Sequence, residues 1–265
     1  MTYPYIKFVG QKKTSTSEET HIGDVQIVLT SGSNNVIHAA QHLGLWAYTT
    51  NANTLSIVTE EGASQKGSLS ITCSDVESGN HIRSAAITTS SSQTLADDDV
   101  TLGKLEVDNV KLSATAGVSY NTEAGYSQGI YAGIITITNS EVNALGGTAY
   151  SLSCGIEAKS GSNPALKIVS SVVNATGGKT TFESSSSSTQ GNSNGIWSTY
   201  CVEISGSSTK VVAKSSDGNY TENYGMKVQG ANNKLSKITD GAYVTCIGGQ
   251  TTSNNSSNMC CSAGM

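Results

Sequence analysis

The 265-residue sequence predicts an all-β protein, a single right-handed parallel β-helix (β-solenoid) of about seven irregular coils. Three observations predict this fold. Val and Ile together number 37 against 13 Leu, and such an excess of β-branched residues favours strands over helices. A 14-residue segment recurs along the chain, and its apolar residues alternate with the two-residue period of a strand. Turns rich in Gly, Asn and Ser separate the alternating segments.

The repeat is clearest in residues 134–147, which align without gaps on residues 165–178 with seven of 14 positions identical. Residues 104–117 fit the same register, and looser copies lie near residues 202–213 and 234–249. We expect the glycine pairs that close two copies, Gly146–Gly147 and Gly177–Gly178, to form corners with positive φ. The alternation predicts the following residues on the inner face: Ile130, Ile135, Ile137, Val142, Ala144, Ile156, Ile168, Val173, Ile196 and Ile204.

A shorter motif recurs before these units and has the pattern Gly, apolar, variable, small or apolar. It begins at Gly44, Gly129, Gly155, Gly195 and Gly225, and the segment 81–84 resembles a sixth copy that has lost its glycine. If the apolar residues face inward, the variable residue of each copy faces outward. The motif therefore predicts one exposed column that could bind a sugar or a protein, made of Trp46, Arg83, Tyr131, Glu157, Trp197 and Lys227.

Three segments are expected along the chain. Residues 1–23 form an N-terminal extension or cap, residues 24–249 the parallel β-helix, and residues 250–265 a Ser/Asn-rich tail that contains Cys260 and Cys261. The first 11 residues hold no apolar stretch long enough for a signal peptide. A composition rich in Ser, Thr and Asn, 91 residues in all, nevertheless favours an extracellular or cell-surface location.

Charge and hydropathy exclude two classes of partner. The net charge is −5 and Arg83 is the only arginine, so the chain cannot easily build the basic face that nucleic acids require. No apolar run approaches the roughly 18 residues of a membrane span, so membrane insertion is not expected.

The six cysteines show no metal-binding spacing. Cys73, Cys154, Cys201 and Cys246 are interpreted as small buried hydrophobic residues. We expect Cys260 and Cys261 to crosslink the tail to another subunit, with Cys73 as a candidate acceptor. Two free thiols in a reducing compartment remain the alternative.

Catalytic patterns are largely missing from the sequence. The only dense carboxylate run, Asp97, Asp98 and Asp99, is interpreted as a solvated turn, and it supplies the only calcium candidates. No nucleophile elbow, phosphate-binding loop or metal-ligand pattern occurs. The chain is therefore expected not to be an enzyme, to have no catalytic residues and to need no cofactor, with a polysaccharide lyase as the least favoured alternative.

Residues 24–37, 67–72 and 129–140 resemble the right-handed parallel β-helix repeats of surface proteins in gut and soil bacteria, some of them labelled carbohydrate-binding or adhesin-like. The resemblance covers roughly residues 24–249. With the repeat pattern, it leads us to expect a structural subunit that assembles with copies of itself into a fibre or surface layer. The alternative is a carbohydrate-binding or adhesin module that uses the exposed column on surface glycans.

Overall fold

The computed structural model describes residues 2–3, 6–8, 12–13, 18–19, 23–47, 53–76, 83–91, 101–120, 125–161, 164–181, 191–217, 221–230 and 235–250. The elements found in these residues are strands, and none of them is a helix that could span a membrane. The prediction of an all-β protein is confirmed.

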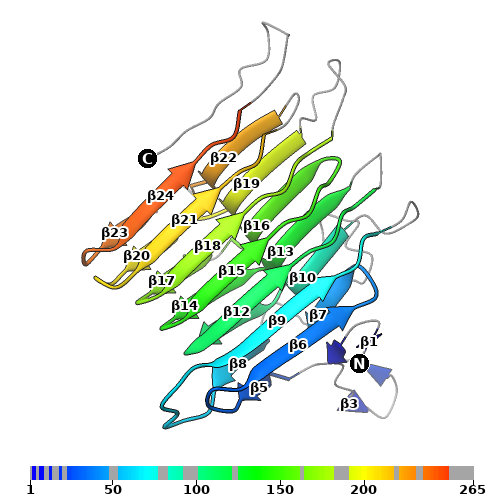
Figure 1. Cartoon of the computed structure of the whole chain (residues 1–265), viewed down its shortest axis with the longest axis vertical. Helices are drawn as coiled ribbons and strands as arrows, with labels where there is room; N and C mark the ends of the chain where they lie inside the picture. Colours follow the sequence, from blue (N-terminus) through cyan, green and yellow to red (C-terminus); the bar gives the residue numbers. More distant parts are fainter. Residues whose placement is uncertain are drawn as a thin grey trace, which may run out of the picture.

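Three parallel sheets contain nearly all the strands, and the chain visits them in a fixed order (Figure 1). Sheet 1 consists of β5 (Val25–Leu29), β8 (Thr54–Thr59), β11 (Lys104–Asp108), β14 (Ile134–Thr138), β17 (Leu166–Val169), β20 (Val202–Ser205) and β23 (Lys237–Thr239). Sheet 2 consists of β1 (Thr2–Tyr3), β6 (Asn34–Ala39), β9 (Gly67–Cys73), β12 (Val110–Thr115), β15 (Glu141–Leu145), β18 (Val172–Thr176), β21 (Lys210–Lys214) and β24 (Tyr243–Ile247). Sheet 3 consists of β2 (Ile6–Phe8), β7 (Leu43–Ala47), β10 (Arg83–Thr89), β13 (Tyr126–Ala132), β16 (Leu152–Ala158), β19 (Gly191–Ser198) and β22 (Thr221–Val228).

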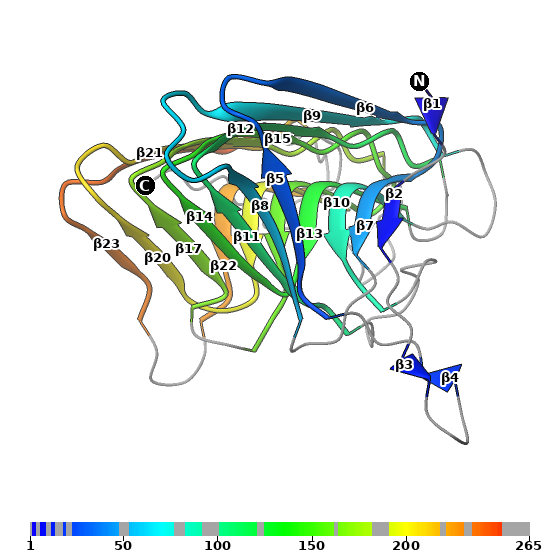
Figure 2. The ribbon, with the colours of Figure 1, turned by 90° about the horizontal axis from the view of Figure 1, so that it is seen from below.

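From β5 onward, each strand of sheet 1 is followed by one of sheet 2 and, up to β22, by one of sheet 3. The described residues thus contain six complete sets of three strands and a seventh set that ends at β24. Figure 2 shows sheet 2 across the top of the view, with sheets 1 and 3 beneath it. This arrangement is consistent with the predicted β-solenoid of about seven coils.

The N-terminal segment contributes strands to two of these sheets. Thr2 and Tyr3 in β1 pair in parallel with β6, and β2 pairs in parallel with β7. A short antiparallel hairpin, β3 (Lys12–Lys13) and β4 (Glu18–Glu19), follows before sheet 1 begins. The N-terminal edges of sheets 2 and 3 are therefore extended, while β5 is the edge strand of sheet 1.

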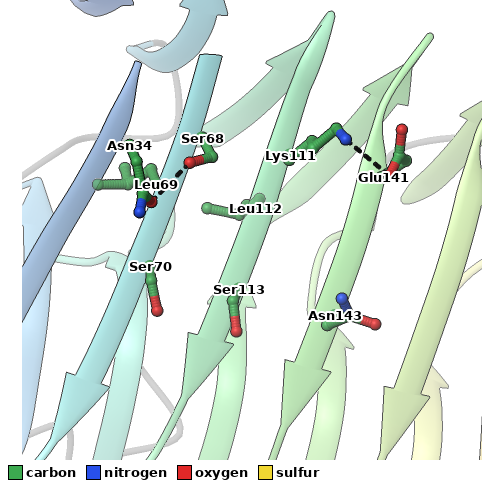
Figure 3. A pocket seen from close by; sticks show the side chains of 9 residues that line it. All are labelled: Asn34, Ser68, Leu69, Ser70, Lys111, Leu112, Ser113, Glu141 and Asn143. Atoms are coloured by element: carbon green, nitrogen blue, oxygen red, sulfur yellow. Dashed lines mark hydrogen bonds and ion pairs between the residues drawn. The ribbon is translucent and has the colours of Figure 1, made fainter. Parts of the chain in front are cut away.

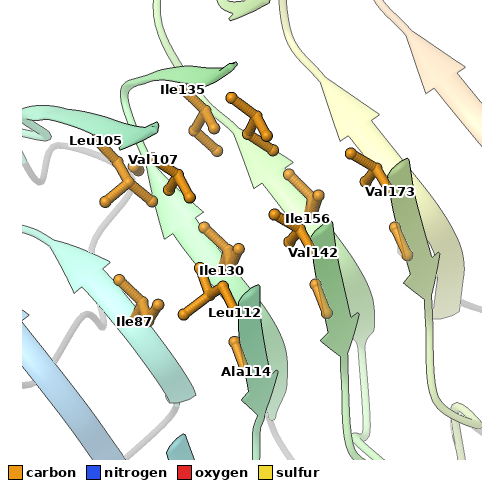
Figure 4. Packing of buried hydrophobic residues seen from close by; sticks show 14 of the residues in the cluster. Ile87, Leu105, Val107, Leu112, Ala114, Ile130, Ile135, Val142, Ile156 and Val173 are labelled. Carbon is orange, nitrogen blue, oxygen red and sulfur yellow. The ribbon is translucent and has the colours of Figure 1, made fainter. Parts of the chain in front are cut away.

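The repeats predict the strand register correctly. Ile137 pairs with Ile168 and Val142 pairs with Val173, which is the offset of the 14-residue repeat. The ten residues predicted on the inner face are all at most 1% exposed, and together they fill the space between the sheets (Figure 4). With the core residues of the neighbouring strands they form ladders of Ile, Val, Leu and Ala, as in the stack of Leu105, Ile135 and Leu166.

The corners differ from the expectation. The predicted glycine pairs lie at corners between sheets 2 and 3 and do not have positive φ. In the described residues, positive φ occurs at corners between sheets 1 and 2, at Asn109, Asn139, Ser170 and Asp240 and at Gly32, Gly62, Gly206 and Gly241. Asn tolerates the left-handed region better than most residues, so a single Asn can turn the chain. The glycine pairs serve close packing instead, because a Cβ on Gly147 would collide with the carbonyl oxygen of Gly117 in the coil below.

Serine side chains satisfy the backbone at the corners between sheets 2 and 3. Ser127 Oγ donates to the Gly117 oxygen at 2.8 Å and accepts from the Gly147 amide at 2.7 Å. Ser153 repeats both bonds one coil later, with Gly147 and Gly178. These two serines therefore link successive strand sets where the ladder bonds of the sheets stop.

Candidate functional site

The outer face of sheet 3 carries the column that the short motif predicts. Trp46, Thr88, Tyr131, Glu157, Trp197 and Lys227 occupy one register position on six adjacent strands. Five of the six predicted members thus stack as expected.

The prediction that this column is exposed is wrong for most of its members. Trp46, Tyr131 and Glu157 are at most 2% exposed, whereas Trp197 is half-buried and the Lys227 side chain is 23% exposed. The physical reason is that this face is covered and forms a second hydrophobic cluster outside the main core. The cluster consists of Leu43, Trp46, Ala85, Leu102 and Tyr131.

The predicted register position of Arg83 is wrong. The residues of β10 that align with Gly44 to Ala47 are Ala86 to Thr89, so an alanine replaces the glycine and Thr88 takes the column position. Arg83 lies at the start of β10 and pairs with Tyr126. Its side chain is 4% exposed and still reaches the column, because its Nη1 lies 3.3 Å from Glu157 Oε2.

Two tyrosine rings enclose the Arg83 guanidinium. Its central carbon lies 4.1 Å from the ring centroid of Tyr131 and 4.5 Å from that of Tyr126. Both distances are within the range of cation–π attraction, which strengthens where water is excluded. The tyrosines thus help to compensate for the hydration that Arg83 loses on burial.

Around Glu157, three adjacent strands present two outward positions each. Gln128 and Tyr131 belong to β13, Cys154 and Glu157 to β16, and Asn194 and Trp197 to β19; we call these six residues the sheet 3 patch. In β13, the two intervening residues Gly129 and Ile130 both turn inward. A Cβ on Gly129 would lie 2.7 Å from the Leu145 amide nitrogen of sheet 2, and Ile130 belongs to the main core.

Ion pairs and hydrogen bonds connect the charged groups of this face. Glu157 Oε2 accepts from Gln128 Nε2 at 2.8 Å in addition to its ion pair with Arg83. Lys227 Nζ lies 2.6 Å from Glu222 Oε2 and 5.4 Å from the ring centroids of Trp197 and Tyr224. The four charges therefore form two opposite pairs, and these four residues leave no net charge on the face.

The buried thiol in the patch is not activated. Burial raises the pKa of Cys154 well above its usual value, and the negative charge of Glu157 raises it further. The hydrogen bond that Asn194 Nδ2 donates to Sγ acts in the opposite direction but is weaker. Because the thiolate is the nucleophilic form, Cys154 is unsuited to nucleophilic catalysis at neutral pH.

Several buried polar atoms on this face have no hydrogen-bond partner. Within the described part of the chain, this applies to Arg83 Nε, Thr88 Oγ1, Gln128 Oε1, Asn194 Oδ1 and Trp197 Nε1. Native proteins satisfy roughly nine-tenths or more of their buried polar groups. Such a concentration on one face distinguishes it from the rest of the described structure.

The outer face of sheet 2 bears an open hollow of about 260 Å³ (Figure 3). Lys111 Nζ lies 3.8 Å from Glu141 Oε2 at its border, and both side chains are about half exposed. The hollow is lined by Asn34, Ser68, Leu69, Ser70, Lys111, Leu112, Ser113, Glu141 and Asn143. Its small hydroxyl and amide groups are solvated, in contrast to those of the sheet 3 patch.

The remaining predicted residues are carboxylates and cysteines, and several of them lie outside the described ranges. Asp97, Asp98, Asp99, Cys260 and Cys261 lie outside the described residues. Cys73 is buried, and burial raises its pKa to about 12. Its crosslink to Cys260 or Cys261 of another chain stays a prediction. Cys154, Cys201 and Cys246 are buried as predicted, and no group of metal-ligating side chains occurs in the described ranges.

Gln128 and Asn194 belong to this face although the variable position of the short motif does not include them. Both directly precede the glycine of a short-motif copy, as do Leu43, Cys154 and Tyr224. This position recurs as regularly as the variable one, so the same repeat contained the signal.

Comparisons with protein-family models, curated proteins and solved structures find no match to this chain.

Proposed function

We propose that the chain is a non-enzymatic structural subunit, extracellular or on a cell surface, that assembles end to end with copies of itself. In this proposal the three sheets form one right-handed parallel β-helix, the hand of about 98% of parallel crossover connections. The observation that carries the proposal is the apolar surface of the last coil. Four of the nine large apolar side chains that are exposed in the described residues lie between residues 235 and 247: Leu235, Ile238, Tyr243 and Ile247.

The inner ladder of sheet 1 supports this reading. It runs through Ile27, Ile57, Val107, Ile137, Ile168, Ile204 and Ile238 in consecutive strands. Its members from Ile57 to Ile204 are at most 1% exposed, whereas Ile238 at the C-terminal end is 49% exposed. A further coil stacked on β23 would bury Ile238 and contribute on the order of 1 kcal/mol from this side chain alone.

The N-terminal end offers a matching surface on a second copy. Ile27 in the edge strand β5 is half-buried, and Val28 and Val36 in the first coil are more than half exposed. All strands of the three sheets run in parallel, so the N-terminal edge strands of one copy, β5, β1 and β2, can follow the last coil of another in the same direction. Such head-to-tail contact does not close on itself and therefore produces an open filament.

A carbohydrate-binding or adhesin role that relies on an exposed aromatic column is less well supported, because Trp46 and Tyr131 are buried. A catalytic role also lacks support, because the buried charges engage each other and the pKa of Cys154 is raised.

Sedimentation velocity and negative-stain electron microscopy test the assembly. We expect the wild-type chain to form rods whose length increases with protein concentration. The double variant Ile238→Asp with Tyr243→Lys should remain monomeric, because it places charges on the surface that the next copy would cover. A matched control is Val172→Asp, which adds a charge at a 38% exposed position in the middle of sheet 2 and should still assemble. A wild-type chain that stays monomeric at all concentrations would contradict the proposal.

A further inference from the structure

Sheet 3 ends one strand earlier than its neighbours at the C-terminal end. Its last strand is β22, whereas sheets 1 and 2 continue to β23 and β24 (Figure 1). Met226 on the inner face of β22 is half-buried, whereas its partner Ile196 in β19 is fully buried. One edge of β22 pairs with β19, and the other pairs with no strand in the described part of the chain. Such an edge presents backbone groups that can accept a further strand.

After β24, the chain turns toward the beginning of β22. Gly249 N donates to Ser215 Oγ at 2.6 Å. Gln250 N donates to Asp217 Oδ1 at 2.7 Å. The Gln250 carbonyl oxygen accepts from Asn223 Nδ2 at 3.0 Å, and Asn223 is the third residue of β22. The chain beyond Gln250 therefore starts at the N-terminal end of the open edge, which is where a parallel strand has to begin.

The strands of sheet 3 share a six-residue pattern that can be compared with the rest of the sequence. Its first position is Ser127, Ser153 and Ser193 in three successive strands, and Asn223 in β22. The second and fifth positions face outward, and the third and fourth face inward, as at Gly129 and Ile130. The sixth position holds a small or apolar residue.

Residues 257–262, which lie outside the described residues, fit this pattern. Their sequence Ser-Asn-Met-Cys-Cys-Ser is identical at three of six positions to residues 193–198 of β19. Met259 and Cys260 then fall on the two inward positions. A shift of the register by one residue would instead place the amide of Asn258 in the core without partners, so the pattern selects one register.

A methionine at the third position is compatible with the last coil. In β22, a Cβ on Gly225 would lie 2.4 Å from the Ile247 amide nitrogen, because β24 packs against it. A strand beyond β24 would be needed to crowd Met259 in the same way, and sheet 2 has none in the part of the chain that the structure describes. The open end of the core can therefore take the Met259 side chain.

We propose that residues 257–262 add to the open edge of β22 of the same chain as a further parallel strand of sheet 3. Cys260 then lies next to Met226 and covers it, and Cys261 lies next to Lys227 on the outer face. Of the two cysteines, only Cys261 is then accessible to another chain. The pairing is intramolecular, so it goes beyond end-to-end assembly and does not depend on it.

Disulfide trapping tests the register in the full chain, diluted until sedimentation velocity shows monomers. Lys227→Cys with Cys260→Ser places two thiols on neighbouring strands with Cα atoms about 4.8 Å apart, within the range of a disulfide. We expect mild oxidation to join position 227 to Cys261 within one chain, as measured by peptide mass spectrometry. Glu222→Cys with Cys260→Ser is the matched control. Its thiol lies roughly 16 Å further along β22 and should give at least tenfold less crosslink.

Two substitutions of adjacent residues test which side chains face the core. Both are made in the Lys227→Cys, Cys260→Ser background, and each adds one negative charge. Met259→Asp places the charge at an inward position and should lower the crosslink yield at least tenfold. Asn258→Asp places it on the outer face and should leave the yield unchanged. The opposite result would overturn the proposed register.

Hydrogen exchange of the unmodified chain provides a second readout. The amides on both edges of β22 should be as protected as those of β19, because both strands are then paired on two sides. Free exchange at every second residue of β22 would contradict the proposal. Equal crosslinking at positions 222 and 227, or none at either, would overturn it. A bond from position 227 to Cys261 that forms only between two chains would also overturn it and assign the edge of β22 to a second copy.

Discussion

The outer faces of sheets 2 and 3 lie over the same aliphatic core but have opposite environments. On sheet 2, Lys111, Glu141 and Asn143 are exposed, and small hydroxyl and amide groups surround an open hollow. On sheet 3, Trp46, Tyr131 and Glu157 at the outward position are buried. The difference shows that two-residue alternation determines which side chains point away from the core. It does not determine whether those outward side chains are exposed to water or covered by other parts of the chain.

The two faces also differ in how they hold charge. Glu141 on sheet 2 has its carboxylate oxygens 3.7 Å from Lys66 Nζ and 3.8 Å from Lys111 Nζ, and its side chain is 47% exposed. Glu157 on sheet 3 lies 3.3 Å from Arg83 Nη1, and its side chain is 2% exposed. Water can replace the partners of the exposed Glu141, whereas the burial of Glu157 makes the loss of its partners costly.

The largest expected effect on stability tests the difference between the buried and the exposed ion pair directly. Glu157→Ala should lower the free energy of unfolding by about 3–5 kcal/mol, because it leaves the Arg83 guanidinium buried without its counter-charge. Glu141→Ala should cost less than about 1 kcal/mol, because its ion pairs are solvated. Urea denaturation followed by circular dichroism measures both. Equal losses in the two variants would contradict the burial of the Arg83–Glu157 pair.

The sequence predicted the fold because the core obeys a simple rule. Ile137 and Ile168 occupy equivalent repeat positions, and stacking apolar side chains on successive strands fixes the register of a parallel sheet that has one buried face. The space between the three sheets is filled by apolar side chains, so an apolar residue at an inward position has one possible environment.

The outer face of sheet 3 was harder to predict for two physical reasons. Its burial depends on segments such as that of Leu102, which pack on the face but lie outside the repeat. The alternation also fails at Gly129 and Ile130, where two consecutive residues face inward and a second outward position appears at Gln128. Ala86 in place of glycine hid the β10 copy of the short motif, which led to the misplacement of Arg83.

A smaller effect is the loss of stability at alkaline pH, which depends on how deeply the cysteine thiols are buried. Burial raises the pKa of Cys73 to about 12 from 9.0, so above pH 9 the unfolded chain loses a proton that the folded chain keeps. The stability that this thiol contributes is complete below pH 9 and decreases by about 1.4 kcal/mol per pH unit between pH 9 and 12. Urea titrations at several pH values measure this slope.

Variants assign the alkaline slope to particular faces. Cys73→Ala should reduce the slope because it removes an inner-face thiol of sheet 2. Cys154→Ala should reduce it as well if the outer face of sheet 3 is as dry as the core, since burial also raises the pKa of Cys154. A slope unchanged by Cys154→Ala would mean that water reaches the sheet 3 patch. Measurements at pH 7 are the control, because both thiols are then protonated in the folded and unfolded chain.

The smallest expected effect lies on the exposed face of sheet 2. Asn174 Nδ2 donates to Asn143 Oδ1 at 3.0 Å between neighbouring strands, and both side chains are exposed. Asn174→Ala should change the free energy of unfolding by no more than about 0.5 kcal/mol, because water replaces the lost partner of Asn143. Thermal and urea unfolding of dilute, monomeric protein measure this difference. A loss well above 1 kcal/mol would mean that the Asn143–Asn174 pair is not simply solvated, and the contrast between the two outer faces would then be one of degree.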